Sequence, residues 1–123
     1  AVAIAMNLLP LEMYSNINRD EVIAALILHD VVKVGFTDDV TAHTEFHHPA
    51  YAAQLIETCF HTDSFDVEEQ TILNICRVVM SHMGQWNTSK DDEVELPKPE
   101  KDDEKFVHLC DYLASRKNLE VIL

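Results

Sequence analysis

Several polar side chains of types that bind metals stand in or beside apolar stretches of the chain. Imidazole nitrogen and carboxylate oxygen together form the ligand set that suits Mn, Fe, Co, Ni or Zn. The three cysteines show no paired spacing, which argues against a structural zinc site. The chemistry expected is therefore that of a catalytic metal with open coordination positions. The groups concerned are the pair His29 and Asp30, the pair His47 and His48, His82, and Asp111.

The adjacent residues His29 and Asp30 can share one ion only under a geometric condition. Neighbours in a regular helix point about 100° apart, so the helix must loosen here, and Gly35 nearby permits this. A metal-free hydrogen-bonded pair at a helix end is the alternative. His82 likewise could do no more than interact with a helix C-terminal dipole. Asp111 lies on the edge of an apolar face, where burial without a metal or hydrogen-bond partner is costly.

Apolar residues at helical spacing predict five helices, and the polar groups fall mostly at their ends. Asn18 with Glu21 forms a capping-box pattern, as does Asp66 with Glu69. Proline is favoured in a first helical turn, so Pro49 marks the start of the third helix. The acidic segment 90–104 is expected to be a surface loop. The predicted helices cover residues 1–9, 18 to near 35, 50–60, 66–82 and 106–114.

These elements predict an all-α fold, a compact single-domain helical bundle of at least five helices spanning residues 1–123. The chain of 123 residues is 47% hydrophobic, enough for one core. Its two glycines leave no phosphate-binding loop of the P-loop or Rossmann type. Strand signals are absent apart from short β-branched pieces such as residues 31–34.

Charge and composition restrict the partners and the compartment. Nine basic and 22 acidic residues give a net charge of −13, which argues against nucleic acid or an anionic membrane as partner. No apolar run is long enough to span a bilayer. Three cysteines in apolar settings indicate a reducing compartment, and the first residues lack the basic region of a secretory signal. The expected location is cytoplasmic.

Four stretches, taken in order, resemble the motifs of the HD-domain superfamily of metal-dependent phosphohydrolases. They read LILHDVVKVG at 26–35, HHPAYAAQLI at 47–56, VMSHMGQW at 79–86 and FVHLCDYLASRK at 106–117. The resemblance implies that His29, Asp30 and Asp111 hold a first divalent ion. A further histidine of that motif is expected before Ala1, the domain being truncated at its N-terminus. The resemblance also implies that His48 and His82 hold a second ion, with Asp30 bridging the two.

The expected function is the cleavage of phosphate from a small phosphorylated substrate, most plausibly a nucleotide. One or two divalent ions (Mn, Fe, Co, Ni, Zn or Mg) would activate a water and shield the phosphate charge. Lys33, about one helical turn beyond Asp30, is the nearest cation to that pair and joins Asp30 as a catalytic candidate. Lys33, Arg116 and Lys117 are the candidates for phosphate contact. Trp86 either stacks on a base or packs internally.

Two other functions stay open, and so do the roles of several residues. The alternatives are a phosphodiesterase acting on cyclic nucleotides or short oligonucleotides, and a regulatory HD module without turnover.

We expect His108 to be a core histidine rather than a partner of the metal ligands, and His43 and His47 to lie at the surface or beside the substrate. The acidic residues 91–95 form a solvated loop or a lid. The oligomeric state has no signal in the sequence.

Overall fold

The computed structural model describes residues 1–35, 44–63 and 66–116, and this part of the chain is helical without any named strand. A single isolated bridge joins Ser89 and Asp92. No helix within the described residues is long and apolar enough to cross a lipid bilayer. The all-α prediction is confirmed. The elements in chain order are α1 (Val2–Leu8), the 3-10 helix η1 (Glu12–Tyr14), α2 (Arg19–Leu28), α3 (His48–Asp63), α4 (Glu69–Met80) and α5 (Asp102–Ala114).

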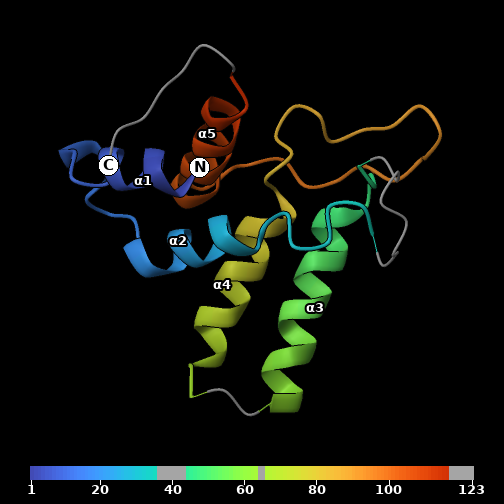
Figure 1. Ribbon diagram of the computed structural model, residues 1–123, viewed down its shortest axis with the longest axis horizontal. Coiled ribbons are helices and arrows are strands. Elements are labelled where there is room, and N and C mark those ends of the chain that lie inside the picture. The colour runs from blue at the N-terminus through green and yellow to red at the C-terminus, as the bar shows by residue number, and fades with distance from the viewer. Residues whose placement is uncertain (36–43, 64–65, 117–123) are drawn as a thin grey trace.

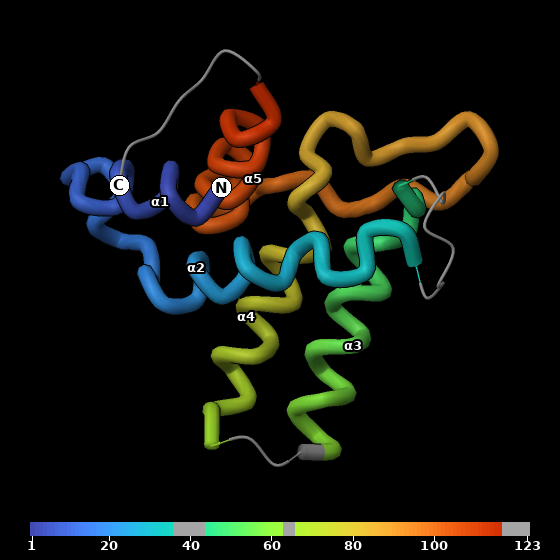
Figure 2. Tube along the Cα trace, viewed as in Figure 1, coloured from blue at the N-terminus to red at the C-terminus, as the bar shows by residue number. Residues whose placement is uncertain are grey.

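The five α-helices form two groups that meet at one end of the α3 and α4 pair. These two helices run side by side in opposite directions, with α2 crossing α4 (Figure 1). Helices α1 and α5 pack against one another, and both contact α2 (Figure 2). The start of α3 and the ends of α2 and α4 are thereby brought together.

One apolar core joins α1, α2, α4 and α5, with Ala52 of α3 at its edge. Phe106 on α5 is 1% exposed and meets the ring of Tyr14 edge to face. Burial of this surface is the main stabilising term, at about 25 cal/mol per Å² removed from water. The packing of this core also fixes which helix ends lie next to each other. Its buried members include Ile4, Ala5, Val22, Ala25, Leu26, Ile75, Val78, Val79, Val107 and Cys110.

Helix α2 begins as predicted but ends earlier. The Asn18 side chain accepts a hydrogen bond from the backbone N–H of Glu21 (3.1 Å). The predicted end near Gly35 is wrong, because α2 ends at Leu28. Three turns of the i to i+3 type follow, and the last is closed by the N–H of Gly35 on Val32 (2.8 Å), with Gly35 at φ +81°. The chain therefore loosens directly at His29, as shared metal binding by neighbours requires.

The other helices also differ from prediction at their ends. Helix α3 starts at His48, two residues before the predicted start, because Pro49 occupies its first turn. Helix α4 starts after Glu68, and the predicted cap at Asp66 is wrong: no side chain caps this end. Helix α5 begins inside the acidic segment predicted as loop. There the Glu104 carboxylate accepts the N–H groups of Lys101 (2.8 Å) and Glu100 (3.2 Å).

Candidate metal centre

A first group of possible ligands joins the turn after α2 to α5. His29 Nε2 lies 3.3 Å from Asp30 Oδ2 and 3.1 Å from Asp111 Oδ1. One ligand atom from each of these three residues lies within 4.8 Å of the others. We call His29, Asp30 and Asp111 the first triad.

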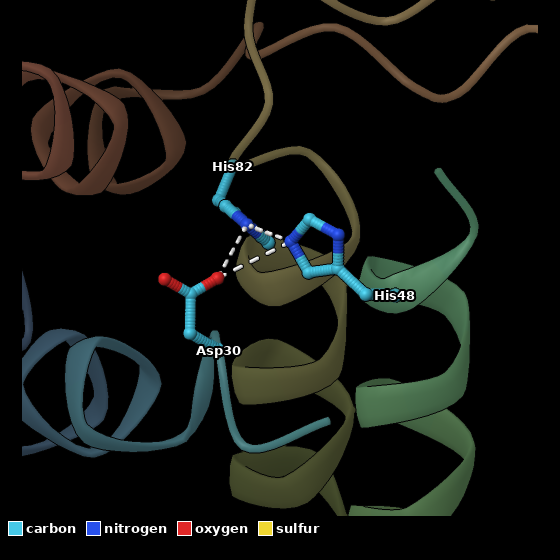
Figure 3. A group of neighbouring side chains, drawn as sticks. All are labelled: Asp30, His48 and His82. Carbon is cyan, nitrogen blue, oxygen red and sulfur yellow. Dashed lines mark hydrogen bonds and ion pairs between the residues drawn. The ribbon is translucent and has the colours of Figure 1, made fainter. Parts of the chain in front are cut away.

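A second group shares Asp30 and joins the ends of three helices. His48 comes from the first turn of α3, and His82 from the turn after α4 (Figure 3). Their Nε2 atoms lie 3.2 Å and 3.6 Å from Asp30 Oδ1 and 3.0 Å from each other. We call Asp30, His48 and His82 the second triad. The two oxygens of Asp30 thus face different triads.

The backbone fixes the tautomer of all three histidines in the same way. The Nδ1 atoms of His29, His48 and His82 lie 2.6, 2.7 and 2.6 Å from the carbonyl oxygens of the residues three positions earlier. A carbonyl only accepts, so each Nδ1 carries the hydrogen and donates it. In the neutral ring Nε2 then keeps its lone pair, which is the form that binds a metal.

The donor set and spacing fit a divalent metal. Nitrogen and oxygen ligands about 2.1 Å from one ion lie about 3.0 to 3.4 Å from each other. Four of the ligand-atom contacts within the triads, 3.0 to 3.3 Å, fall in this range, and the contact between His82 and Asp30 is longer at 3.6 Å. Two neutral imidazoles with lone pairs on both facing Nε2 atoms repel at 3.0 Å, so His48 and His82 require a proton or a cation between them. A metal meets that requirement and uses the buried carboxylate as well.

The pKa shifts of the metal-free groups reflect strong pairing. Burial lowers the pKa of His29, but its hydrogen bonds with Asp111 and Asp30 outweigh burial and raise it from 6.5 to about 10. Burial opposes ionisation of Asp30, yet hydrogen bonds from His29, His48 and His82 hold its pKa well below the ordinary value. Burial likewise disfavours the charged form of Asp111, and the bond from His29 overcomes this and lowers its pKa. Both carboxylates are therefore ionised at neutral pH, and a metal at the first triad displaces a proton from His29.

All triad residues except His29 line a cleft of about 240 Å³, which is also lined by three of the predicted substrate-side residues. Lys33 lines it, with Nζ 3.8 Å from Asp30 Oδ2. Trp86 is 48% exposed and lines the same cleft, as does Arg116. Lys117, the fourth predicted residue, lies outside the described residues, as does His43.

Sequence reasoning missed Tyr112, which contacts two of the predicted substrate-side residues in the cleft wall. Its ring stacks on Trp86 (centroids 5.9 Å apart, planes at 15°), and the Arg116 guanidinium lies 4.5 Å from its centroid. The missed signal was an aromatic residue directly after Asp111 with a cation four residues later, just past the end of α5.

His108 differs from the expectation of a core histidine. It is only half-buried, lines the cleft, and donates from Nδ1 to the backbone carbonyl of His82 (2.9 Å). A side chain on Gly84 would lie 2.2 Å from the His108 ring, and Gly84 has φ +60°. The absence of a side chain at Gly84 thus lets the His108 ring support the turn that carries His82.

The acidic loop is tied to the site at one point. His47 is half-buried and pairs through Nε2 with Asp92 Oδ2. That contact and a hydrogen bond from the N–H of Val94 lower the pKa of Asp92. The residues around Asp92 are therefore attached beside His48 and are not a wholly free loop.

Helix α5, which carries Asp111, is anchored to α4 by charged contacts below the site. Arg77 donates two hydrogen bonds to Asp103 (3.0 and 2.6 Å), and its guanidinium also lies 3.3 Å from Glu104. Ser81, next to His82, donates to the same Glu104 carboxylate (3.4 Å). These contacts set the position of Asp111 relative to His82.

A family model described as HD domain matches residues 1–116 of the chain. The matched range includes all five α-helices and every residue of both triads. No curated protein matches the chain, and neither does any solved structure. The assignment therefore rests on the pattern of the whole domain rather than on one similar relative.

The raised pKa of His29 predicts a pH dependence of stability in the metal-free protein. The folded chain keeps this proton up to about pH 10, whereas the unfolded chain loses it near 6.5. The stabilisation is thus complete below pH 6.5 and is lost as pH rises toward 10. Urea unfolding between pH 6.5 and about 7.5, below the ordinary pKa of a cysteine thiol, should show the free energy of unfolding falling by up to about 1.4 kcal/mol per pH unit. A His29→Gln variant should lack this slope; an equal slope in the variant contradicts the assignment.

The contact of Gly84 with His108 predicts a specific loss in a Gly84→Ala variant. Alanine in this left-handed backbone conformation would be strained and would displace the His108 ring. Together these effects should lower the free energy of unfolding by at least about 2 kcal/mol. Metal affinity, measured by calorimetry, should fall as well because His82 loses its support. Gly35→Ala is the matched control: it shares the positive φ, but its nearest contact would be 3.6 Å. Equal losses of metal affinity in both variants would show that the His108 contact is unimportant.

Proposed function

The chain belongs to the HD domain family, a superfamily of metal-dependent phosphohydrolases, and we propose that it removes phosphate from a small phosphorylated molecule, a nucleotide. The observation that carries the proposal is the pair of triads sharing Asp30, each with its histidine tautomers set by the backbone.

In this proposal His29, Asp30 and Asp111 hold one divalent ion, and Asp30, His48 and His82 hold a second. A bound ion supplies a water of lowered pKa and neutralises charge on the phosphate. The imidazole and carboxylate ligand set suits Mn, Fe, Co, Ni or Zn. The depressed pKa values of Asp30 and Asp111 keep both carboxylates charged and ready as ligands at neutral pH.

Two cations of the cleft are placed to bind the phosphate. Lys33 and Arg116 line the same cleft as the two carboxylates. In a chain of net charge −13 they supply the local positive charge that admits an anion. A cleft of about 240 Å³ also suits a small molecule better than a polymer.

The aromatic wall supports a nucleotide as the substrate. Trp86 and Tyr112 are stacked beside the proposed phosphate position, and nearly half of the Trp86 surface is exposed. An exposed indole face binds the flat face of a nucleobase with about 1 to 3 kcal/mol. A sugar phosphate without a base would leave this surface unused.

The proposed ligands predict a joint loss of metal and activity. Asp30→Asn and Asp111→Asn should each lower phosphate release from nucleoside monophosphates at least about 100-fold and reduce bound metal, measured by elemental analysis. Asp20→Asn, which changes an exposed aspartate in the same way, should leave both unchanged. Full activity in either site variant would refute the metal centre. Wild-type protein that is folded and metal-loaded but inactive on nucleotides, cyclic nucleotides and sugar phosphates would favour a regulatory module.

The aromatic wall predicts discrimination between nucleotides and sugar phosphates. Trp86→Ala should raise KM for a nucleoside monophosphate about tenfold or more while leaving KM for ribose 5-phosphate unchanged, because only the former has a base to stack. Trp86→Phe should retain most of the preference. Trp86 is the sole tryptophan, so nucleotide binding should also quench the intrinsic fluorescence of the wild type. Equal changes for both substrates would show that Trp86 does not bind the base.

A further inference from the structure

A second cleft, of about 370 Å³, lies beside the metal cleft, with His108 in the wall between them. It is formed where the long connection from α4 to α5 passes the first turns of α5 (Figure 1). None of its residues belongs to either triad. The lining consists of Gly84, Gln85, Lys98, Pro99, Lys105 and His108.

The charge of this lining is opposite to that of the chain as a whole. Two lysines line the second cleft and no carboxylate does, although acidic residues outnumber basic ones by 22 to 9. The metal cleft differs, since Asp30 and Asp111 line it together with its two cations. A hollow with two positive charges and no carboxylate in its lining attracts anions rather than metals.

Both ammonium groups are available to a ligand. Neither Lys98 nor Lys105 forms an ion pair or a side-chain hydrogen bond with any described residue. Lys33, by comparison, lies against a carboxylate of its own chain. Asp102 lies one helical turn before Lys105 and is the nearest acidic residue on that side of α5. Its carboxylate accepts a hydrogen bond from the Asn16 side chain (2.8 Å) rather than pairing with Lys105.

We propose that this second cleft, between Lys98 and Lys105, binds a small phosphate-type oxyanion. Two ammonium groups on facing segments can contact different oxygens of one tetrahedral anion. The Gln85 side-chain amide in the lining offers a further neutral donor. The inference does not rest on the proposed hydrolysis: the cleft binds its anion whether or not the metal centre turns over a substrate.

The second cleft is connected to the metal centre through His108. His108 lines both clefts and donates to the carbonyl of His82, and Gly84 packs under its ring. An anion in the second cleft would therefore contact the residues that support His82.

The test is a titration of metal-free, chelator-free protein with inorganic phosphate, followed by ¹H–¹⁵N NMR. Saturable shifts of the Gly84 and Gln85 amide signals are expected. Lys98→Gln/Lys105→Gln should weaken this binding about tenfold, because two charge contacts are lost. Arg19→Gln/Lys90→Gln changes the net charge equally at exposed cations that do not line the cleft and should leave the affinity within about twofold.

A parallel titration with ribose 5-phosphate tests whether the cleft binds a phosphoryl group that is part of a larger molecule rather than free phosphate. Saturation of the Gly84 and Gln85 signals by either anion supports the site. The proposal is overturned if neither anion saturates them, if both double variants weaken binding equally, or if the shifts are confined to Asp30, Lys33 and Arg116. The last result would place phosphate in the metal cleft alone and would leave the proposed hydrolysis intact.

Discussion

The Asp30 carboxylate is the point on which the rest of the site depends. One oxygen faces His29 and Lys33, and the other faces His48 and His82. These contacts join the end of α2 to the start of α3 and the turn after α4, while His29 extends the network to Asp111 on α5. The charge of this half-buried carboxylate is stabilised by the donors that surround it.

The apolar core and the polar site constrain each other. Core residues such as Val22, Val79 and Phe106 decide which helices are neighbours, and the ligand-bearing ends meet as a result. The contacts of Arg77 with Asp103 and Glu104 then fix how far α5 slides along α4. The ligands therefore take their places from the packing of the helices, and the three histidines are finally oriented by their backbone hydrogen bonds.

Helix periodicity predicted the fold class and all five α-helices, because apolar faces repeat along the chain. Helix ends were less predictable, as the absent cap at Asp66 and the early end of α2 show. Residue type and position singled out the candidate ligands, but only the resemblance to the HD-domain superfamily grouped them into two sets with Asp30 shared between them. The roles of Tyr112 and His108 depend on contacts with Trp86 and Gly84, which are distant in sequence from α5. The 3-10 helix Glu12–Tyr14 had no recognisable signal.

The bonds from His29 and His82 to carbonyls of the preceding helical turn have an evolutionary consequence. The carbonyls of Leu26 and Val79 lie in the last turns of α2 and α4, and His29 and His82 each supply a side-chain donor to the end of their own helix. A descendant that lost its reaction would still gain stability by retaining them. Asp30 and Asp111 offer no such independent benefit, because their burial is favourable only with cationic partners or a metal. Among diverging copies of this domain, the two aspartates should therefore disappear first, and their retention separates working sites from inherited scaffolds better than the histidines do.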